Sequence, residues 1–424
     1  MKENLLHFVW KLKMFTTKKK ILSTKGDLIE IISAGTENLN SGPDFFNSKI
    51  KIANQLWVGN VEIHVKSSNW YEHNHQEDER YNSIILHVVW EHDVEVFRNT
   101  NENIVTLELK NFISPVVLAQ YNKLFLQPKK WINCENEIEN IDSFVLNHFF
   151  EQLYFERLEQ KSSLISQKLK NSNYNWETVF FSFLSKAFGL KVNGDSFYNF
   201  SNSFDFSLVR KTGSNLFQLE ALFFGQAGLL ENEYESTYYN SLKSEYNYLK
   251  SKFKTTSINK NEIQFFRLRP NNFPTIRLSQ LATLYHKHQN LFSKIIEINS
   301  LDGFYKLFEV TTTEYWETHY TFETTSKKNV KKITKAFVDL LLINVIIPFK
   351  FLYLQQQGKT DYAEIMKLIE AIKPEKNSII SNFDSLKIKS TNAFETQALL
   401  QLKNEYCSKL KCLNCAVGKT LLTS

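Results

Sequence analysis

A carboxylate and an imidazole share one face of an apolar segment in the first fifth of the chain. In "VGNVEIHVK", Glu62, His64 and Lys66 alternate with β-branched apolar residues. This period of two predicts a β-strand with its polar side chains on one face. Asp44 stands at the start of the preceding predicted strand, in "GPDFF". Two neighbouring carboxylates repel each other, so the pattern predicts a divalent cation between them, Mg²⁺ or Mn²⁺.

The chemistry expected of such a site is hydrolysis of a phosphodiester. A divalent ion activates water and stabilises the charge on a phosphate under attack. Asp44 and Glu62 would hold the ion, and Lys66 on the same face is a further candidate for catalysis and nucleic-acid binding. His64 would be the third ligand or the base that orients the water, because a histidine near neutral pH serves in either role.

Histidines are dense around this segment. The loop "WYEHNHQEDERY" offers His73, His75 and Asp78, and the apolar strand that follows contains His87. We expect these residues to complete a metal or phosphate site with Asp44, Glu62 and His64. The alternative is a solvated loop followed by one core histidine.

The cysteines form a second candidate site. Cys407, Cys412 and Cys415 have the spacing C-x4-C-x2-C, and Cys134 is the fourth cysteine of the chain. In a reducing compartment, four thiols of this kind fit a [4Fe–4S] cluster or a Zn²⁺ site. The alternative is four small buried hydrophobic side chains.

Two arginines in the second half of the chain are candidate phosphate ligands. Arg269 and Arg277 flank two prolines in "RLRPNNFPTIRL". Arginine suits phosphate contacts, and the prolines would fix the loop. Core packing with surface charges is the alternative.

The elements that must position these residues fall into two classes. A helix is predicted at 5–14, and strands at 27–33, 48–53, 55–65, 83–90 and 105–110, whereas amphipathic helical patterns dominate from 144 onward. The predicted fold class is α+β. Its parts are a mixed-sheet domain at 1–112, a linker with Cys134 at 113–143, and a helical domain at 144–424 that carries the cysteine cluster.

Composition excludes several classes of protein. The 424 residues are 42% hydrophobic, which is enough for a large core and too much for a disordered chain. The net charge of +6 is a mild excess that permits nucleic-acid binding without indicating it. No secretory signal is visible. The longest apolar run, 337–354, contains Asp339, Pro348 and Lys350, so we expect a buried helix pair, no membrane span and a cytoplasmic location.

The order of helix, three strands, crossover and strand resembles the restriction-endonuclease-like nuclease superfamily. Its signature is Pro-Asp followed on the next strand by Asp/Glu-x-Lys. Pro43-Asp44 and Glu62-Ile63-His64 match it, with His64 where the lysine is expected. The resemblance implies metal-dependent cleavage of DNA or RNA. The cysteine cluster is similar to that of iron-staple nucleases, although their lone cysteine precedes the nuclease motifs and Cys134 follows them.

A set of longer motifs resembles one bacterial family over essentially the whole chain. The motifs are "GNVEIHV", "EALFFGQAG", "NFPTIRL", "YWETHY" and the terminal "CLNCAVG". They are similar to the family domain of unknown function 2851. The resemblance implies a single-chain bacterial protein of this size and implies no activity.

Three functions therefore stay open. The preferred one is a divalent-metal-dependent nuclease with a structural cysteine-bound metal. The alternatives are a nucleic-acid-binding protein that kept the fold without catalysis, and a histidine-rich zinc or manganese hydrolase of a small substrate.

Overall fold

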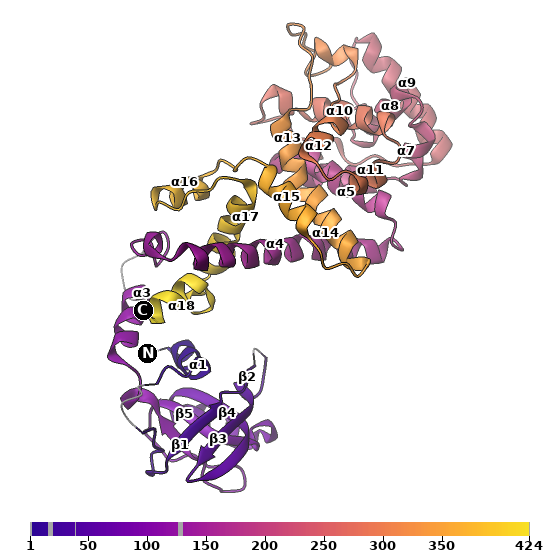
Figure 1. The fold of residues 1–424 in the computed structure, drawn as a ribbon. Coiled ribbons are helices and arrows are strands. Elements are labelled where there is room, and N and C mark those ends of the chain that lie inside the picture. Colours follow the sequence, from indigo (N-terminus) through magenta and orange to yellow (C-terminus); the bar gives the residue numbers. More distant parts are fainter. Residues whose placement is uncertain (1, 16–19, 39, 126–129, 424) are drawn as a thin grey trace. The chain divides into compact units, whose positions relative to one another are not determined.

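The computed structural model describes residues 2–15, 20–38, 40–125 and 130–423 (Figure 1). The chain divides into two compact units. The first unit combines residues 1–149 with 402–424, and the second unit is 150–401. The predicted segments 1–112 and 113–143 thus lie together in the first unit. The predicted helical domain 144–424 is divided, because its last residues pack with the N-terminal part of the chain.

A mixed sheet forms the centre of the first unit. Its strand order is β1-β3-β4-β5-β6, with the short β2 paired to β3. The first three strands along this path are antiparallel, whereas β4, β5 and β6 are parallel. The sheet confirms the predicted α+β class with a mixed sheet. The strands are β1 (Ile29–Ser33), β2 (Thr36–Glu37), β3 (Phe45–Ile52), β4 (Gln55–Lys66), β5 (Ile84–Glu91) and β6 (Thr106–Glu108).

A tight hairpin sets the register between β3 and β4. Ala53 and Asn54 have φ angles of 47° and 72°, as a two-residue turn that matches the strand twist requires. The turn therefore lies one residue earlier than the predicted Asn54-Gln55. The turn pairs Ile52 with Gln55 and Ser48 with Gly59, and a register shift between Phe45 and Ser48 then pairs Phe45 with Val61. Asp44 consequently lies beside the strand that carries Glu62.

The crossover from β4 to β5 is a series of short helical turns packed on the sheet. They are α2 (Asn69–Glu72), η1 (His75–Glu77) and η2 (Glu79–Tyr81). Trp70 is fully buried in a cluster with Tyr81 and Ile84. This anchor holds the segment with His73 and His75 close to the sheet instead of leaving it a solvated loop.

Helices complete the first unit. Helix α1 (Glu3–Lys11) buries one apolar face against β4, and its Trp10 Nε1 donates a hydrogen bond of 3.0 Å to Ala34 O. The last residues of the unit contact α1 and α3. The remaining elements are α3 (Pro115–Phe125), η4 (Ile138–Asn140), the π-helical turn η9 (Leu402–Cys407), η10 (Cys412–Asn414) and α18 (Ala416–Thr423).

The second unit is helical, as the amphipathic patterns predict, and α4 (Ser143–Asn171) leads into it. Its core is rich in phenylalanine, with Phe180, Phe181 and Phe223 fully buried. The helices are α5 (Trp176–Phe188), α6 (Leu190–Asn202), α7 (Ser207–Thr212), α8 (Leu216–Gln226), α9 (Thr237–Phe253), α10 (Pro274–Lys287), α11 (Leu291–Glu297), α12 (Leu301–Leu307), α13 (Lys335–Leu341), α14 (Ile347–Gln356), α15 (Ala363–Ala371), α16 (Ser378–Ser385) and α17 (Ala393–Gln401).

The long apolar run forms one continuous helix, and the predicted helix pair is wrong. Helices α13 and α14 are joined by a π-helical segment, Leu342–Ile346. Pro348 lacks an N–H, and a wider turn accommodates the missing hydrogen bond. Lys335–Gln356 is the one helix of the described residues that is long and apolar enough to cross a membrane, but 72% of its most apolar window is buried. That burial is typical of a core helix in a soluble protein.

Candidate metal centre

The two predicted carboxylates lie side by side on the sheet. The backbone N–H of Asp44 donates to Glu62 Oε2 at 3.1 Å, and the N–H of Ile63 donates to Asp44 Oδ2 at 2.9 Å. These reciprocal bonds fix both side chains across the β3–β4 pair. The side chain of Asp44 is 19% exposed and that of Glu62 is 6% exposed, so the pair faces a largely enclosed space.

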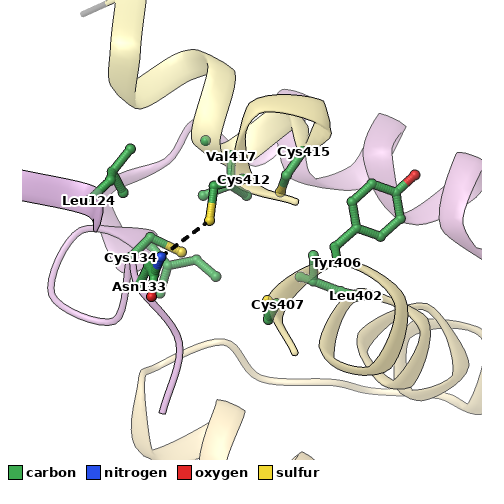
Figure 2. Close-up of a pocket in the computed structure, with 11 residues that line it drawn as sticks. Leu124, Asn133, Cys134, Leu402, Tyr406, Cys407, Cys412, Cys415 and Val417 are labelled. Atoms are coloured by element: carbon green, nitrogen blue, oxygen red, sulfur yellow. Dashed lines mark hydrogen bonds between the residues drawn. The ribbon is translucent and has the colours of Figure 1, made fainter. Parts of the chain in front are cut away.

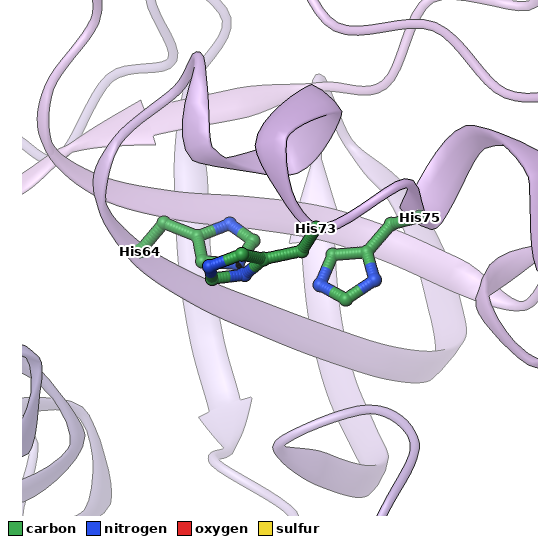
Figure 3. A group of neighbouring side chains, drawn as sticks. All are labelled: His64, His73 and His75. Atoms are coloured by element: carbon green, nitrogen blue, oxygen red, sulfur yellow. Dashed lines mark hydrogen bonds between the residues drawn. The ribbon is translucent and has the colours of Figure 1, made fainter.

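Three histidines, His64, His73 and His75, lie close together at this site (Figure 3). His64 Nε2 lies 3.6 Å and His75 Nε2 lies 3.3 Å from Glu62 Oε1. His73 Nδ1 lies 3.2 Å from His64 Nε2. In the described residues, these three histidines are the one group of three or more His, Cys, Asp or Glu whose ligand atoms all lie within 4.8 Å of one another.

These separations match the edges of a tetrahedral coordination sphere. Zinc binds imidazole nitrogen at about 2.0–2.1 Å, so two ligands of a tetrahedral site are about 3.3–3.5 Å apart. Three donor pairs among Glu62, His64, His73 and His75 are 3.6, 3.3 and 3.2 Å apart, which is close to that spacing. Of these four residues, only the three histidines form a group in which every ligand atom lies within 4.8 Å of the others. One oxygen and three nitrogen donors suit zinc, and also manganese or iron.

His87 lies behind the centre, not within the ligand set predicted for it. Its Nε2 is 2.9 Å from His64 Nδ1, and the residue is fully buried. For the lone pair of His64 Nε2 to bind a cation, its Nδ1 must carry the proton and donate it to His87. His87 thus fixes the ring orientation and tautomer of His64, as an outer-shell partner of a metal ligand does.

Burial disfavours charge throughout the cluster. It raises the pKa of Glu62 to about 9, with a further contribution from the charge of Asp44. It lowers the pKa of His64 to about 2 and that of His87 to about 3, and it also lowers the pKa of His75. His64, His75 and His87 are therefore neutral at pH 7, and a neutral imidazole is the form that binds a metal.

Sequence reasoning missed His7, which α1 brings to the carboxylates. Its Nε2 lies 3.3 Å from Asp44 Oδ2. Burial lowers the pKa of His7, but the charge of Asp44 and those of Glu3 and Glu37 outweigh it and raise that pKa overall. The sequence signal that could have identified His7 is its position as the single polar residue in the apolar run "LLHFVW".

Two predicted residues of the N-terminal region lie apart from the cluster. Lys66 ends β4 and is exposed. Asp78 forms an ion pair of 2.5 Å with Arg80 at the surface, and the hydrogen bonds from Arg80 lower its pKa to about 2. Asp78 therefore lies outside the ligand group, and Lys66, which is predicted as a catalytic and nucleic-acid-binding residue, is a surface side chain.

The two predicted arginines belong to the second unit. Arg269 precedes η6 (Pro270–Asn272) and is exposed. Arg277 is 7% exposed, lies 3.7 Å from the ring centroid of Phe337 and donates hydrogen bonds to Gln280 and Asn272. Its guanidinium is held within the helical core, where it organises packing.

The four cysteines line one small cavity of the first unit (Figure 2). Cys134 precedes η4, and Cys407, Cys412 and Cys415 lie at η9, η10 and the start of α18. The cavity has a volume of about 20 Å³, and none of the cysteines forms a disulfide. The backbone N–H groups of Val417 and Gly418 donate to Cys415. Amide donors of this kind stabilise thiolates around a metal.

Burial keeps these cysteines protonated unless a cation binds them. It raises the pKa of Cys407 to about 12 and that of Cys415 to about 11, and mutual repulsion of the thiolates adds to the effect. It raises the pKa values of Cys134 and Cys412 as well. A bound metal ion would offset both penalties.

The fold and these clusters define a protein with a mixed sheet, a histidine–carboxylate centre on that sheet and a long helical continuation. The chain belongs to the family described as protein of unknown function (DUF2851), whose model matches residues 3–378. The match contains the histidine–carboxylate cluster and Cys134, and it ends before Cys407. No curated protein and no solved structure matched the chain.

Removal of the outer-shell imidazole should weaken metal binding. We expect His87→Phe to lower the affinity for zinc or manganese by about 10- to 100-fold, because His64 Nδ1 loses its acceptor. His87→Gln, which keeps a polar acceptor, should recover part of the loss. Competition with a chromogenic chelator measures both. Equal affinities for wild type and His87→Phe would show that His87 is only a packing residue.

The pKa shifts predict a stability maximum near pH 6.5 for chelator-treated protein. Below pH 6.5 the unfolded chain protonates His64 and His87, whose folded pKa values are about 2 and 3, so acid destabilises the fold. Above pH 6.5 the folded chain keeps the proton on Glu62 up to about pH 9, whereas the unfolded chain has lost it, so stability falls. Thermal unfolding midpoints measure the curve, and Glu62→Gln should flatten its alkaline side.

Proposed function

We propose that the chain is a divalent-metal-dependent phosphodiesterase that cleaves nucleic acid. The observation that carries the proposal is the group of His64, His73 and His75, whose ligand atoms all lie within 4.8 Å of one another, with Glu62 Oε1 next to two of them. Asp44 stands next to this set and remains accessible.

The residues around the ligands have separate roles. A divalent ion in this position supplies an activated water and stabilises charge on the phosphate. Asp44 accepts the proton of the attacking water, and the N–H of Ile63 orients its carboxylate. His7, whose pKa is raised, is the neighbouring acid that returns a proton to the leaving oxygen.

The position of His64 explains how a nuclease of this type can lack the usual lysine. The side chain of His64 is 2% exposed and its Nε2 faces Glu62 and His73, so it acts as a ligand instead of a base. Protonated His7 then supplies the positive charge beside Asp44. The element order and the adjacent Asp44 and Glu62 support a restriction-endonuclease-like core for the first unit.

A histidine-rich zinc or manganese hydrolase of a small substrate is the second candidate function. The observation in its favour is the predominance of imidazole over carboxylate among the four donors, which is unusual for a Mg²⁺ nuclease. For the same reason, we expect the proposed phosphodiesterase to prefer manganese, zinc or iron over magnesium.

The proposal includes a second metal site, in which the four cysteines are the ligands. In a tetrahedral zinc site the sulfur atoms are about 3.8 Å apart, given Zn–S bonds of about 2.3 Å. The cysteine sulfurs do not meet the 4.8 Å limit that the three histidines meet. Each thiolate of a [4Fe–4S] cluster binds a different iron, which needs wider spacing. The cluster is therefore preferred, in a reducing, cytoplasmic location.

The direct test is metal-dependent cleavage by the whole chain. Labelled DNA and RNA, single-stranded and duplex, are incubated with chelator-treated protein and with Mn²⁺, Zn²⁺, Fe²⁺ or Mg²⁺ added back. Cleavage that requires an added ion supports the proposal. Binding without cleavage favours a non-catalytic nucleic-acid-binding protein, and hydrolysis confined to small esters favours the second candidate.

A further inference from the structure

A basic groove lies beside the metal centre within the first unit. Its volume is about 580 Å³, and its walls are α1 and the segment that carries the last three cysteines. One acidic residue lines it, Glu37, which is 2.6 Å from Lys11. The lining lysines are Lys2, Lys11, Lys409, Lys411 and Lys419.

Three of these lysines have an uncompensated charge. Within the described parts of the chain, no ion pair involves Lys2, Lys411 or Lys419, whereas Lys409 pairs with Glu405 at 2.5 Å. All three are exposed. Several like charges around one concavity repel each other and attract a polyanion, whose bound counterions are released on contact.

Apolar side chains interleave with the lysines. Leu12 is 43% exposed and Leu410 is 57% exposed, and Phe125 also lines the groove. Unpaired bases can pack on such side chains, whereas a duplex keeps its bases stacked inside. The same groove is lined by His7, which contacts Asp44 of the metal centre. His7 therefore connects the groove to the proposed site of hydrolysis.

We infer that a single nucleic-acid strand lies in this groove, and that the cysteine-bound metal holds the lysine-bearing wall in place. Cleavage of the bound strand rests on the proposed function, whereas binding of the strand does not. Lys411 precedes Cys412, and Lys419 lies one turn after Cys415 in α18. A metal that fixes the two cysteines consequently fixes the backbone from which both lysines extend, so strand binding depends on that metal.

The experiment measures binding apart from cleavage. All variants are made in Glu62→Gln full-length protein, and fluorescence anisotropy follows a labelled oligo(dT) or oligo(U) strand over a range of salt concentrations. Lys2→Gln, Lys411→Gln and Lys419→Gln together should weaken binding about 10- to 100-fold and lower the salt slope by about 2. Lys367→Gln, Lys373→Gln and Lys376→Gln, three exposed lysines of the second unit, remove the same charge and should have little effect.

Two further measurements separate the inference from the proposed function. Cys415→Ser should weaken strand binding like the triple variant if the metal fixes the wall. Without the Glu62 change, the triple variant should still hydrolyse bis(p-nitrophenyl) phosphate, which reaches the ion without the groove. Equal strand binding by wild-type and triple-variant proteins overturns the groove, even where cleavage is seen. Weakened binding without any hydrolysis keeps the groove and overturns the nuclease.

Discussion

Glu62→Gln is expected to lower phosphodiester cleavage by at least about 1,000-fold, a loss of about 4 kcal/mol of transition-state stabilisation. The amide keeps the shape of the side chain and removes the negative charge that the ion requires. Glu62 Oε1 is also the atom that links His64 and His75 in the ligand set. The bound metal should therefore fall with the rate.

The measurement pairs a cleavage rate with metal content. Zinc, manganese and iron per chain are determined by mass spectrometry on the same preparation that is assayed. Glu91→Gln is the matched control, because Glu91 lies on the neighbouring strand, at the exposed end of β5. An unchanged rate and metal content in Glu62→Gln would leave the carboxylate as a buried structural group.

Cys415→Ser is expected to remove the second metal and to destabilise the first unit. Serine is a poor ligand for iron or zinc and places a hydroxyl in a cavity that Leu124, Ile138 and Leu402 also line. We expect the free energy of unfolding to fall by roughly 3–5 kcal/mol, because metal binding contributes directly to folding. Visible absorbance of the purified protein distinguishes an iron–sulfur cluster from zinc.

A neighbouring serine provides the control for Cys415→Ser. Ser408→Ala changes an exposed neighbour of Cys407 and should affect neither metal content nor stability. If the four thiols only fill space, Cys415→Ser should cost about 1–2 kcal/mol for a buried hydroxyl and leave metal content unchanged. That outcome would also mean that no cysteine-bound metal holds the lysine-bearing wall of the basic groove.

A glycine beside this cluster allows an independent test of its geometry. A Cβ on Gly418 would lie 2.0 Å from Cys412 O, far inside any normal contact. Gly418→Ala should therefore displace η10 from α18 and lower metal content without changing any thiol. Alanine at Gly358, where a Cβ would meet nothing within 4 Å, leaves the cysteine region untouched.

The inner part of the metal centre could be predicted because it depends on local pattern. Alternation along β4 places Glu62 and His64 on one face, and the antiparallel hairpin brings Asp44 to the neighbouring strand. The exact pairing depends on a register shift between Phe45 and Ser48 that the sequence does not show. His73 and His75 follow from their density, although the sequence does not show that Trp70 anchors their segment to the sheet. The local sequence pattern therefore predicted most of the residues of this site.

What the sequence could not show depends on contacts between distant residues. His7 reaches Asp44 only because α1 packs on β4. Arg277 was predicted to bind phosphate, but burial next to Phe337 is decided by the packing of α10 against the rest of the helical core. Alternation also places Lys66 on the face of Glu62, yet the strand ends there and the side chain reaches solvent.

The first unit is assembled from two stretches of chain that are separated by the whole of the second unit. A ribosome adds about 5–20 residues each second, so Cys134 emerges many seconds before Cys407 can meet it. During this time the sheet and α1 lack residues 402–424, which complete the first unit. If the four cysteines hold the proposed metal, they can do so only after Cys415 has left the ribosome, so metal binding would be a late step in the maturation of the first unit.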